Sequence, residues 1–558
     1  MNRFKRGASC LFCLLLVQTA FAETFKLQIS KETTRITTPL LPDGTPDYLR
    51  AYEQQAAAGV TPQNNAGAVI QRLLGLPWPK GAPGGPDPDA PASATAPASQ
   101  SATQPTPYVF EDWKSYGTRQ GGNGPQHEAW LKLQAEKLQK PVDRTEHEPW
   151  KADDFPLLAQ YLAAQEAPLK LLAAATLRPR YFLPQRQVTA PTVAWDKSRP
   201  GIPGDLHKIR YMAKTLQMMA MLRAGSGDAT GALEDAETIR RLARLVQQEP
   251  TILSMMVGAS SDMMSWQTDL TLVQMDGLTQ VQLSQLATET STTEEFRFAP
   301  AALDIGERFL LLHFVMEAIH GNTQETVRLI SGLESTFFFV DQNSPRPILA
   351  LGDLPQTDWN IVLRILNQRI DGMLAIANLT DTIKQRDQAL AFSTDHQIAK
   401  KAGIVINPII NETPKLDLNT KRRNLIEHLE AYLKRRADES PATYSERIAE
   451  LFAGDSSLLA TQFNVIQRPR VDQRQLQIVL ALRAYHEVKG IYPTQLSELA
   501  PTFLARIPVD PFSNLPMIYR REGNGFILYS VGFNGKDDGG KDHLDQKDAD
   551  DIVVKRSH

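Results

Sequence analysis

The apolar residues of this chain repeat with two different periods, and the period changes near the C-terminus. From about residue 125 to residue 463 the apolar positions recur at the spacing of an amphipathic helix. One face of the stretch 205–222 shows this well, and it carries Leu206, Ile209, Met212, Leu216 and Met219. No stretch recurs at a fixed interval, so the sequence predicts an irregular multi-helix array rather than a solenoid.

Strand-like runs appear only in the last part of the chain. Residues 471–490 still have a helical pattern, and Gly490 ends it. The runs PMIYRRE and GFILYS then flank a Gly523-Asn524-Gly525 turn, an arrangement typical of an antiparallel hairpin. The sequence therefore predicts a mainly α protein followed by a small α+β domain with an antiparallel sheet.

The first 22 residues have the three parts of a secretory signal peptide. Three basic residues precede an apolar run at 8–17, and Ala-Phe-Ala at 20–22 is a small-residue cleavage site. Both cysteines, Cys10 and Cys13, lie in this segment, so a mature chain that begins at Glu23 has no thiol for disulfides or catalysis. The sequence predicts an exported protein, periplasmic or extracellular, with an uncleaved anchor as the alternative.

Composition and pattern divide the chain into five parts. Residues 81–107 are rich in Pro, Ala, Ser and Gly without a large apolar side chain, which predicts a disordered linker. The predicted organisation is a signal peptide at 1–22, a strand plus two helices at 23–80, the linker at 81–107, a helical domain at 108–465 and the α+β domain at 466–558.

Charge and hydropathy argue against two classes of protein. The net charge is −3 and no part of the chain is strongly basic, which argues against nucleic-acid binding. The basic clusters at 421–423 and 434–436 are interpreted as a solvated helix face. After the leader, no apolar stretch approaches the length of a membrane span, so none is expected in the mature chain.

An acidic stretch closes the chain, with seven aspartates from Asp537 to Asp551 before a final Ile-Val-Val. Carboxylates this close repel one another unless solvent or a cation screens them. Two interpretations are open at this point: a solvated acidic tail, and a loop that wraps a calcium ion with its oxygen atoms. The spacing does not match an EF-hand loop.

The pieces of the C-terminal segment occur in an order that resembles a known family. ALRAYHEVKGIYPTQLSEL is followed by IPVDPFSNLPMIYR, FILYSVGFNGKDDGG and DADDIVV. This succession is similar to the globular end of the major pseudopilin of type II secretion systems, over about the last ninety residues. The whole chain also resembles a group of large exported bacterial proteins with no assigned activity.

The pseudopilin resemblance implies a calcium ion that holds the end of the sheet. The ligands that it implies are the main-chain carbonyl of Val531 and the side chains of Asn534, Asp548, Asp550 and Asp551. An asparagine at 534 stands where the family usually has aspartate, and its amide oxygen is still a competent calcium ligand. The pseudopilin-like part lies far from the leader, which argues against polymerisation into a pilus.

Two other groups of residues are candidate metal ligands. His313, Glu317 and His320 fall on one helical face, but the second Glu-x-x-His that a di-iron site needs is missing. Nine of the thirteen methionines lie between Met212 and Met275, where core packing is the preferred interpretation over copper binding. No nucleophile elbow, Walker loop or dinucleotide fingerprint appears.

The sequence favours an exported, non-catalytic binding or structural protein with a calcium-stabilised, pseudopilin-like C-terminal module. Its partner would be an envelope or secreted protein that the sequence does not identify. Catalysis stays open, because the absence of motifs removes the reason to name a reaction without excluding one. The alternatives are an exported hydrolase that acts on a polymer in a cleft between helices, and an accessory protein of type II secretion.

Overall fold

A computed structural model describes the protein at residues 26–79, 81–85, 109–121, 145–184, 206–275, 277–297, 299–320, 357–379, 381–395, 439–453, 457–542, 545–546 and 548–556. The predicted signal peptide and both basic clusters lie outside these residues, and so does the predicted linker apart from residues 81–85. Where it is described, the chain is mainly helical and has a three-stranded antiparallel sheet near its C-terminus, which confirms the coarse prediction of fold class.

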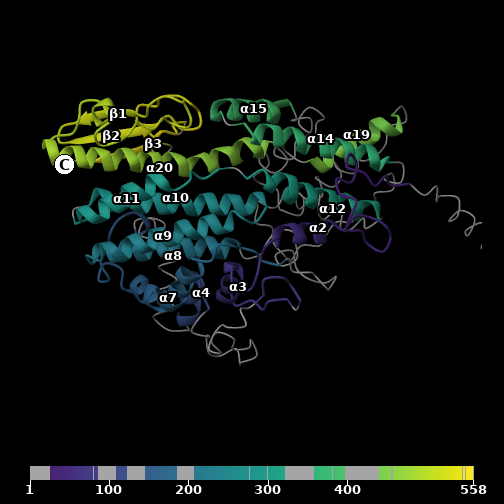
Figure 1. Cartoon of the computed structure of the whole chain (residues 1–558), viewed down its shortest axis with the longest axis horizontal. Coiled ribbons are helices and arrows are strands. Elements are labelled where there is room, and N and C mark those ends of the chain that lie inside the picture. The colour runs from purple at the N-terminus through teal and green to yellow at the C-terminus, as the bar shows by residue number, and fades with distance from the viewer. Residues whose placement is uncertain are drawn as a thin grey trace, which may run out of the picture. The chain divides into compact units, whose positions relative to one another are not determined.

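Figure 1 shows these helices and strands with the labels used below. The helices are α2 (Tyr48–Ala56), α3 (Ala66–Leu73), α4 (Trp113–Gly121), α7 (Pro156–Ala175), α8 (Leu206–Gly225), α9 (Ala229–Val246), α10 (Ile252–Gln274), α11 (Gln280–Thr292), α12 (Arg308–Ile319), α14 (Trp359–Ala377), α15 (Thr382–Asp395), α19 (Pro441–Ala453) and α20 (Ser457–Lys489). A π-helical turn at Ala302–Glu307 precedes α12, and a 3-10 turn occupies Leu496–Leu499. Within the described ranges, none of the helices has the length and apolar character needed to cross a membrane.

Contacts divide the chain into two compact units. The first contains the residues up to Ala51 together with 310–371 and 397–455. The second contains residues 52–309, 372–396 and 456–558. The predicted acidic site and the strands therefore belong to the second unit.

In the first unit, asparagine side chains of α14 hold the N-terminal segment. The amide oxygen of Asn360 accepts from Gln28 N at 2.9 Å, and its nitrogen donates to Lys26 O at 3.2 Å. The buried Asn367 donates to Thr33 O at 2.7 Å. Main-chain groups that lack a helix or sheet partner are satisfied in this way.

The strand predicted within residues 23–80 is not formed where that range is described, and this prediction was wrong. Hydroxyl groups bond to the main chain there instead: Glu32 N donates to Ser30 Oγ at 3.2 Å, and Thr34 Oγ1 donates to Ser30 O at 3.0 Å. Such local bonds compete with a strand ladder. Residues 31–35 consequently form turns, and an isolated bridge joins Leu40 to Pro46.

The second unit has a helical core built on α8, α9 and α10. The predicted apolar face of α8 is buried here, and burial of one large apolar side chain contributes about 2 kcal/mol. Small residues of α10 let its neighbours approach closely. A side chain at Gly258 would lie 3.0 Å from the Ala243 carbonyl of α9 and against the ring of Phe296.

Side-chain caps fix where these helices begin. Asp228 accepts from Gly231 N at the start of α9, and Thr251 accepts from Ser254 N at the start of α10. Thr279 and Gln282 form a reciprocal capping box at the start of α11. Each cap satisfies N–H groups that have no partner within the helix, and a cap of this kind contributes about 1 kcal/mol.

A buried layer of charge joins α9, α10 and α11. Arg240 of α9 pairs with Asp269 of α10 and with Glu289 of α11, and its guanidinium lies 3.8 Å from the ring centre of Trp266. The buried Asp262 accepts from Trp266 Nε1 at 3.0 Å. Carboxylates buried this deeply need such partners, since loss of one partner leaves an uncompensated charge.

Helix α20 lies between the helical core and the sheet (Figure 1). Its buried glutamines bond to main-chain carbonyls of both neighbours. Gln473 donates to Thr290 O and Thr293 O at the end of α11, and Gln475 donates to Ile552 O at 2.6 Å. The apolar residues of α10, α11, α20 and the sheet form one continuous cluster.

The sheet contains β1 (Ile518–Glu522), β2 (Gly525–Ser530) and β3 (Ile552–Arg556), with β2 in the middle and both pairings antiparallel. The hairpin turn falls at the predicted Gly523-Asn524 position, because Glu522 pairs with Gly525. Every residue of β2 is buried. The acidic stretch lies between β2 and β3, so the chain returns to the sheet after it.

Candidate functional site

The acidic loop, residues 531–551, is held at its base by a carboxylate from another part of the module. Asp510 of the Asp-Pro-Phe sequence is buried and accepts three hydrogen bonds. The donors are Phe512 N at 2.9 Å, Ser530 Oγ at 2.8 Å and Val531 N at 3.0 Å. The loop therefore starts from a fixed position at the end of β2.

The Gly-x-Tyr-Pro sequence is also structural. Glu498 accepts from Tyr485 OH at 2.8 Å and from both the main chain and the hydroxyl of Thr494. These hydrogen bonds lower the pKa of Glu498 to about 2, the Thr494 side chain having the largest effect. Tyr519 OH donates to Pro493 O at 2.8 Å. The motif thus ties the end of α20 to β1.

Within the loop, Asn534 and Asp538 connect the two ends of the acidic stretch. Asn534 N donates to Asp550 Oδ2 at 2.9 Å, and the Asn534 side-chain nitrogen donates to Asp538 Oδ2 at 2.9 Å. Asp538 Oδ2 also accepts from Asp550 N at 3.1 Å. These hydrogen bonds connect Asn534 and Asp538, which follow β2, with Asp550, which precedes β3.

Asp551 is the most deeply buried acid of the loop, with 2% of its surface exposed. Its Oδ2 accepts from Asp538 N at 3.1 Å and from Gly540 N at 2.8 Å. Its Oδ1 is buried and has no hydrogen-bond donor among the described residues, and the same holds for Asp550 Oδ1. Two neighbouring carboxylates thus each present one buried oxygen that the protein does not satisfy.

The pKa values of these groups agree with that arrangement. Burial raises the pKa of Asp550 and of Asp551 above the ordinary carboxyl value, although main-chain donors act in the opposite direction. The hydrogen bond from the Asn534 side chain lowers the pKa of Asp538. A raised pKa means that the protein stabilises the negative charge poorly, and a bound cation would remove that deficit.

The structure joins three of the five residues of the predicted site by hydrogen bonds, Asn534 with Asp550 directly and Asp551 through Asp538. Val531 donates to Asp510, and the next residue, Gly532, packs so closely on Asp550 that a side chain there would lie 2.2 Å from the Asp550 carbonyl. Asp548 is exposed, and no hydrogen bond joins its side chain to the other acids among the described residues. Whether these residues bind an ion stays a prediction.

Sequence reasoning missed the roles of Asp538 and Asp510. Asp538 was counted only as one of seven acids, yet it bridges Asn534 and Asp550. The available signal was the Gly539-Gly540 pair directly after it. Both glycines have positive φ, 78° and 75°, so the chain turns back toward the end of the loop there.

Asp550 Oδ1 and Asp551 Oδ1 are the orphaned oxygens of the loop, because they are buried and have no donor among the described residues. They allow a test of whether the loop fits calcium. Calcium takes hard oxygen ligands, and carboxylates, main-chain carbonyls and waters all supply them. Asp550 Oδ1 and Asp551 Oδ1 fit that chemistry. In the described parts of the chain, no three His, Cys, Asp or Glu side chains are already grouped to hold a metal ion. The Val531 carbonyl, the side chains of Asn534 and Asp548, or waters would therefore have to complete the ligand set.

His313 and Glu317 lie on α12, and His320 directly follows its end and makes a different contact. His320 Nε2 lies 3.1 Å from Asp43 Oδ2 within the first unit. Burial lowers the pKa of His313, against the opposing charges of Glu317 and Asp47. His320 therefore takes part in a polar contact with the N-terminal segment.

The methionine-rich stretch lies in the helical core. Met212, Met221 and Met255 are fully buried, and Met218 and Met264 are nearly so. All of these except Met255 belong to one apolar cluster with leucines and alanines of α8 and α9. Their burial agrees with the core-packing interpretation.

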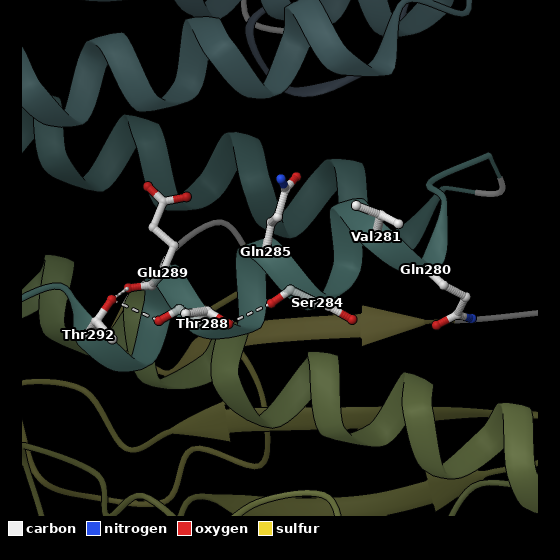
Figure 2. Close-up of a pocket in the computed structure, with 7 residues that line it drawn as sticks. All are labelled: Gln280, Val281, Ser284, Gln285, Thr288, Glu289 and Thr292. Atoms are coloured by element: carbon white, nitrogen blue, oxygen red, sulfur yellow. Dashed lines mark hydrogen bonds between the residues drawn. The ribbon is translucent and has the colours of Figure 1, made fainter.

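A shallow groove of about 650 Å³ follows the surface of α11 (Figure 2). Its hydroxyl groups are turned back onto their own helix: Thr288 donates to Ser284 O, and Thr292 donates to Thr288 O, both at 2.9 Å. Figure 2 shows Gln285 and Glu289 extending away from the helix on the same side. No set of converging catalytic groups lines this surface.

A second groove of about 910 Å³ lies between α9 and α11. Three of its carboxylates are paired with arginines, Glu237 with Arg241, and Asp269 and Glu289 with Arg240. Burial raises the pKa of Asp269 against the attraction of Arg240. The arginine pairing favours a structural role over acid–base catalysis for these carboxylates.

Comparison with known proteins adds no relative: no family model, no curated protein and no solved structure matches the chain. The pseudopilin resemblance consequently depends on the quoted sequence pieces alone.

Proposed function

We propose that this chain is an exported, non-catalytic binding or structural protein whose C-terminal, pseudopilin-like module is stabilised by calcium in the acidic loop. The observation that carries the proposal is the pair of buried oxygens, Asp550 Oδ1 and Asp551 Oδ1, that lack a donor among the described residues. Each is a ready ligand for a hard divalent cation. The signal-peptide pattern at residues 1–22 supports export.

Asp550 and Asp551 would hold the ion, with the Val531 carbonyl, Asn534 and Asp548 as the further ligands that the resemblance implies. When bound, calcium supplies two positive charges where carboxylates crowd together. Because these ligands come from both ends of the loop, the bound ion would link the end of β2 to the start of β3, and these two strands pair in the sheet. In this role the ion stabilises the fold and takes part in no reaction.

Calcium titration of the full-length mature chain tests the proposal, by calorimetry and by thermal melting in calcium and in EDTA. Binding to the folded state alone adds about 2.7 kcal/mol of stability at a calcium concentration of 100 times Kd. We expect Asp551→Asn to weaken binding by about tenfold or more, because it removes a charge from the ligand set.

Asp545→Asn is the matched control, since Asp545 is an exposed acid of the same loop. It should bind calcium almost as the parent chain does. The calcium proposal fails if the melting temperature is the same in calcium and EDTA, or if both variants bind equally. Asp548→Asn separately decides whether Asp548 is a ligand, and N-terminal sequencing of the exported chain tests cleavage before Glu23.

A further inference from the structure

Helix α15 contacts the C-terminal module beside the acidic loop, although more than a hundred residues separate them in sequence. Thr382 Oγ1 donates to Pro511 O at 2.6 Å, and Arg386 NH1 donates to Phe512 O at 3.4 Å. The Arg386 guanidinium also covers Gly535 of the loop. A Cβ at Gly535 would lie 2.8 Å from Arg386 NH1, so a side chain there would displace the guanidinium from this contact.

The position of Arg386 is fixed by the groups around it. The preceding residue, Gln385, is buried and donates to the carbonyls of Ile376 at 3.2 Å and Ala377 at 3.0 Å. The guanidinium itself is held by Asp387, whose Oδ1 accepts from Arg386 Nε at 3.0 Å. These contacts orient the Arg386 side chain toward the loop, and the carboxylate of Asp387 neutralises part of its positive charge.

The residue that Arg386 covers lies directly next to the centre of the loop's hydrogen bonds. Gly535 has a φ of 69° and follows Asn534, whose main-chain and side-chain nitrogens bind Asp550 and Asp538. A shift of Gly535 would move Asn534 and so the carboxylates that it orients. The contact therefore adjoins Asn534, which binds Asp550, the residue that carries one of the two orphaned oxygens.

We propose that Arg386 of α15 is a positioning residue for the acidic loop, which sets the loop's conformation and thereby its affinity for a divalent cation. The cation part of this inference rests on the function proposed above. Coupling between two sites is reciprocal, so a cation in the loop also strengthens the docking of α15. A helix outside the pseudopilin-like segment would in this way control its ion site.

The effect of charge and the effect of position have opposite signs, which makes the proposal testable. Loss of a nearby positive charge alone would strengthen cation binding. Loss of the contact with Gly535 should weaken it by disordering the loop. Lys384→Gln removes the same charge from the same helix at an exposed position, so its comparison with Arg386→Gln separates the two effects.

In the full-length chain we expect Arg386→Gln to bind calcium at least about fivefold more weakly than Lys384→Gln. Hydrogen exchange should show faster exchange of the 534–540 amides in Arg386→Gln, in EDTA as well as in calcium. Amides of α15 should exchange more slowly in calcium than in EDTA in the parent chain, and this difference should disappear in Arg386→Gln.

Gly535→Ala is the second variant, and it is combined with Arg386→Gln in a double-mutant cycle. Gly535→Ala alone adds a Cβ against Arg386 and strains a positive φ, whereas in the Arg386→Gln background only the strain remains. The cost of Gly535→Ala to loop protection should therefore be smaller in that background.

The outcomes separate this inference from the calcium proposal. If the parent chain binds no calcium, the proposed function fails, and exchange of the loop in EDTA still decides whether Arg386 positions it. If calcium binds but Arg386→Gln and Lys384→Gln have equal affinities and equal loop exchange, the positioning role is overturned while the calcium site stands. Additive costs in the cycle would overturn it as well.

Discussion

At the scale of single residues, Asp510 joins three parts of the C-terminal module with one buried side chain. Its two oxygens accept from Phe512 N, Ser530 Oγ and Val531 N. Hydrogen bonds to a charged acceptor contribute more than neutral ones, about 1.5–3 kcal/mol each. The Asp-Pro-Phe and Leu-Tyr-Ser sequences are therefore connected by hydrogen bonds through Asp510.

Asp510→Asn should lower the free energy of unfolding by about 3 kcal/mol, because an amide nitrogen replaces one acceptor and faces N–H donors. Urea denaturation of the full chain, followed by near-UV circular dichroism, measures this. Asp545→Asn makes the same chemical change at an exposed site and should stay within about 0.5 kcal/mol of the parent. Equal midpoints for the two variants would show that the Asp510 bonds contribute nothing.

The candidate site was only partly predictable from sequence. The pseudopilin resemblance drew attention to Asn534, Asp550 and Asp551, and the structure places these three residues in one hydrogen-bonded loop. Pattern reasoning could not single out Asp538, since all seven acids look alike without the turn that brings one of them back. The contact from Arg386 was also out of reach, because nothing local in the sequence links residue 386 to residue 535.

At the scale of elements, helical periodicity and the hairpin turn were the most reliable signals. Both depend on neighbours in sequence, and the structure has the α8 face, the Gly523-Asn524 turn and the strands around it as predicted. The strand expected within residues 23–80 failed for the opposite reason: serine and threonine side chains satisfied the main chain locally. The contacts of α20 with the helical core and with the sheet join residues that are far apart in the sequence, and no local sequence pattern predicts them.

One continuous cluster of apolar residues joins α10 and α11 to the sheet through α20, and this predicts shared stability. Leu270 of α10 is 6% exposed and belongs to that cluster. Leu270→Ala should cost about 2–5 kcal/mol through lost burial and the cavity left behind. Native-state hydrogen exchange should show faster exchange at β2 amides as well as at α10 amides.

Leu177→Ala is the control for this prediction, since Leu177 is 70% exposed and should change stability little. If Leu270→Ala weakens the α10 amides alone and leaves β2 unchanged, the helices and the sheet unfold independently. The two outcomes therefore distinguish a shared core from two cores in contact.

At the scale of the whole molecule, the second unit contains several carboxyl groups that burial keeps from ionising easily. Burial raises the pKa of Glu249 to about 7, although Ser254 Oγ donates to it at 2.8 Å. Burial likewise raises the pKa of Glu307 to about 7, against the hydrogen bond from Ile252 N. The arginine-paired acids of this unit with raised pKa values are Asp235, Asp262, Asp269 and Asp472.

The sign of the resulting pH dependence follows from proton linkage. In the unfolded chain a glutamate has a pKa of about 4.3, so between that pH and 7 the folded state binds more protons than the unfolded state. The stability that these groups contribute is complete below pH 4 and is lost as the pH rises through 7. Repulsion among exposed charges is present at every pH and is weaker at moderate salt. His313 acts in the opposite direction, because burial lowers its pKa, but it is one group against several acids.

We therefore expect the calcium-free protein to melt at a higher temperature at pH 5.5 than at pH 8, at constant ionic strength in EDTA. Glu249→Gln should reduce this difference, because the amide does not ionise and avoids a penalty of at most about 4 kcal/mol at pH 8. Glu294→Gln, at an exposed position, should keep the parent's pH dependence. A stability maximum at pH 8 in the parent chain, or an unchanged slope in Glu249→Gln, would contradict the assignment. The pH dependence that Glu249 contributes comes from its burial rather than from an ion pair. Its partners among the described residues are hydroxyl groups, and no arginine is among them.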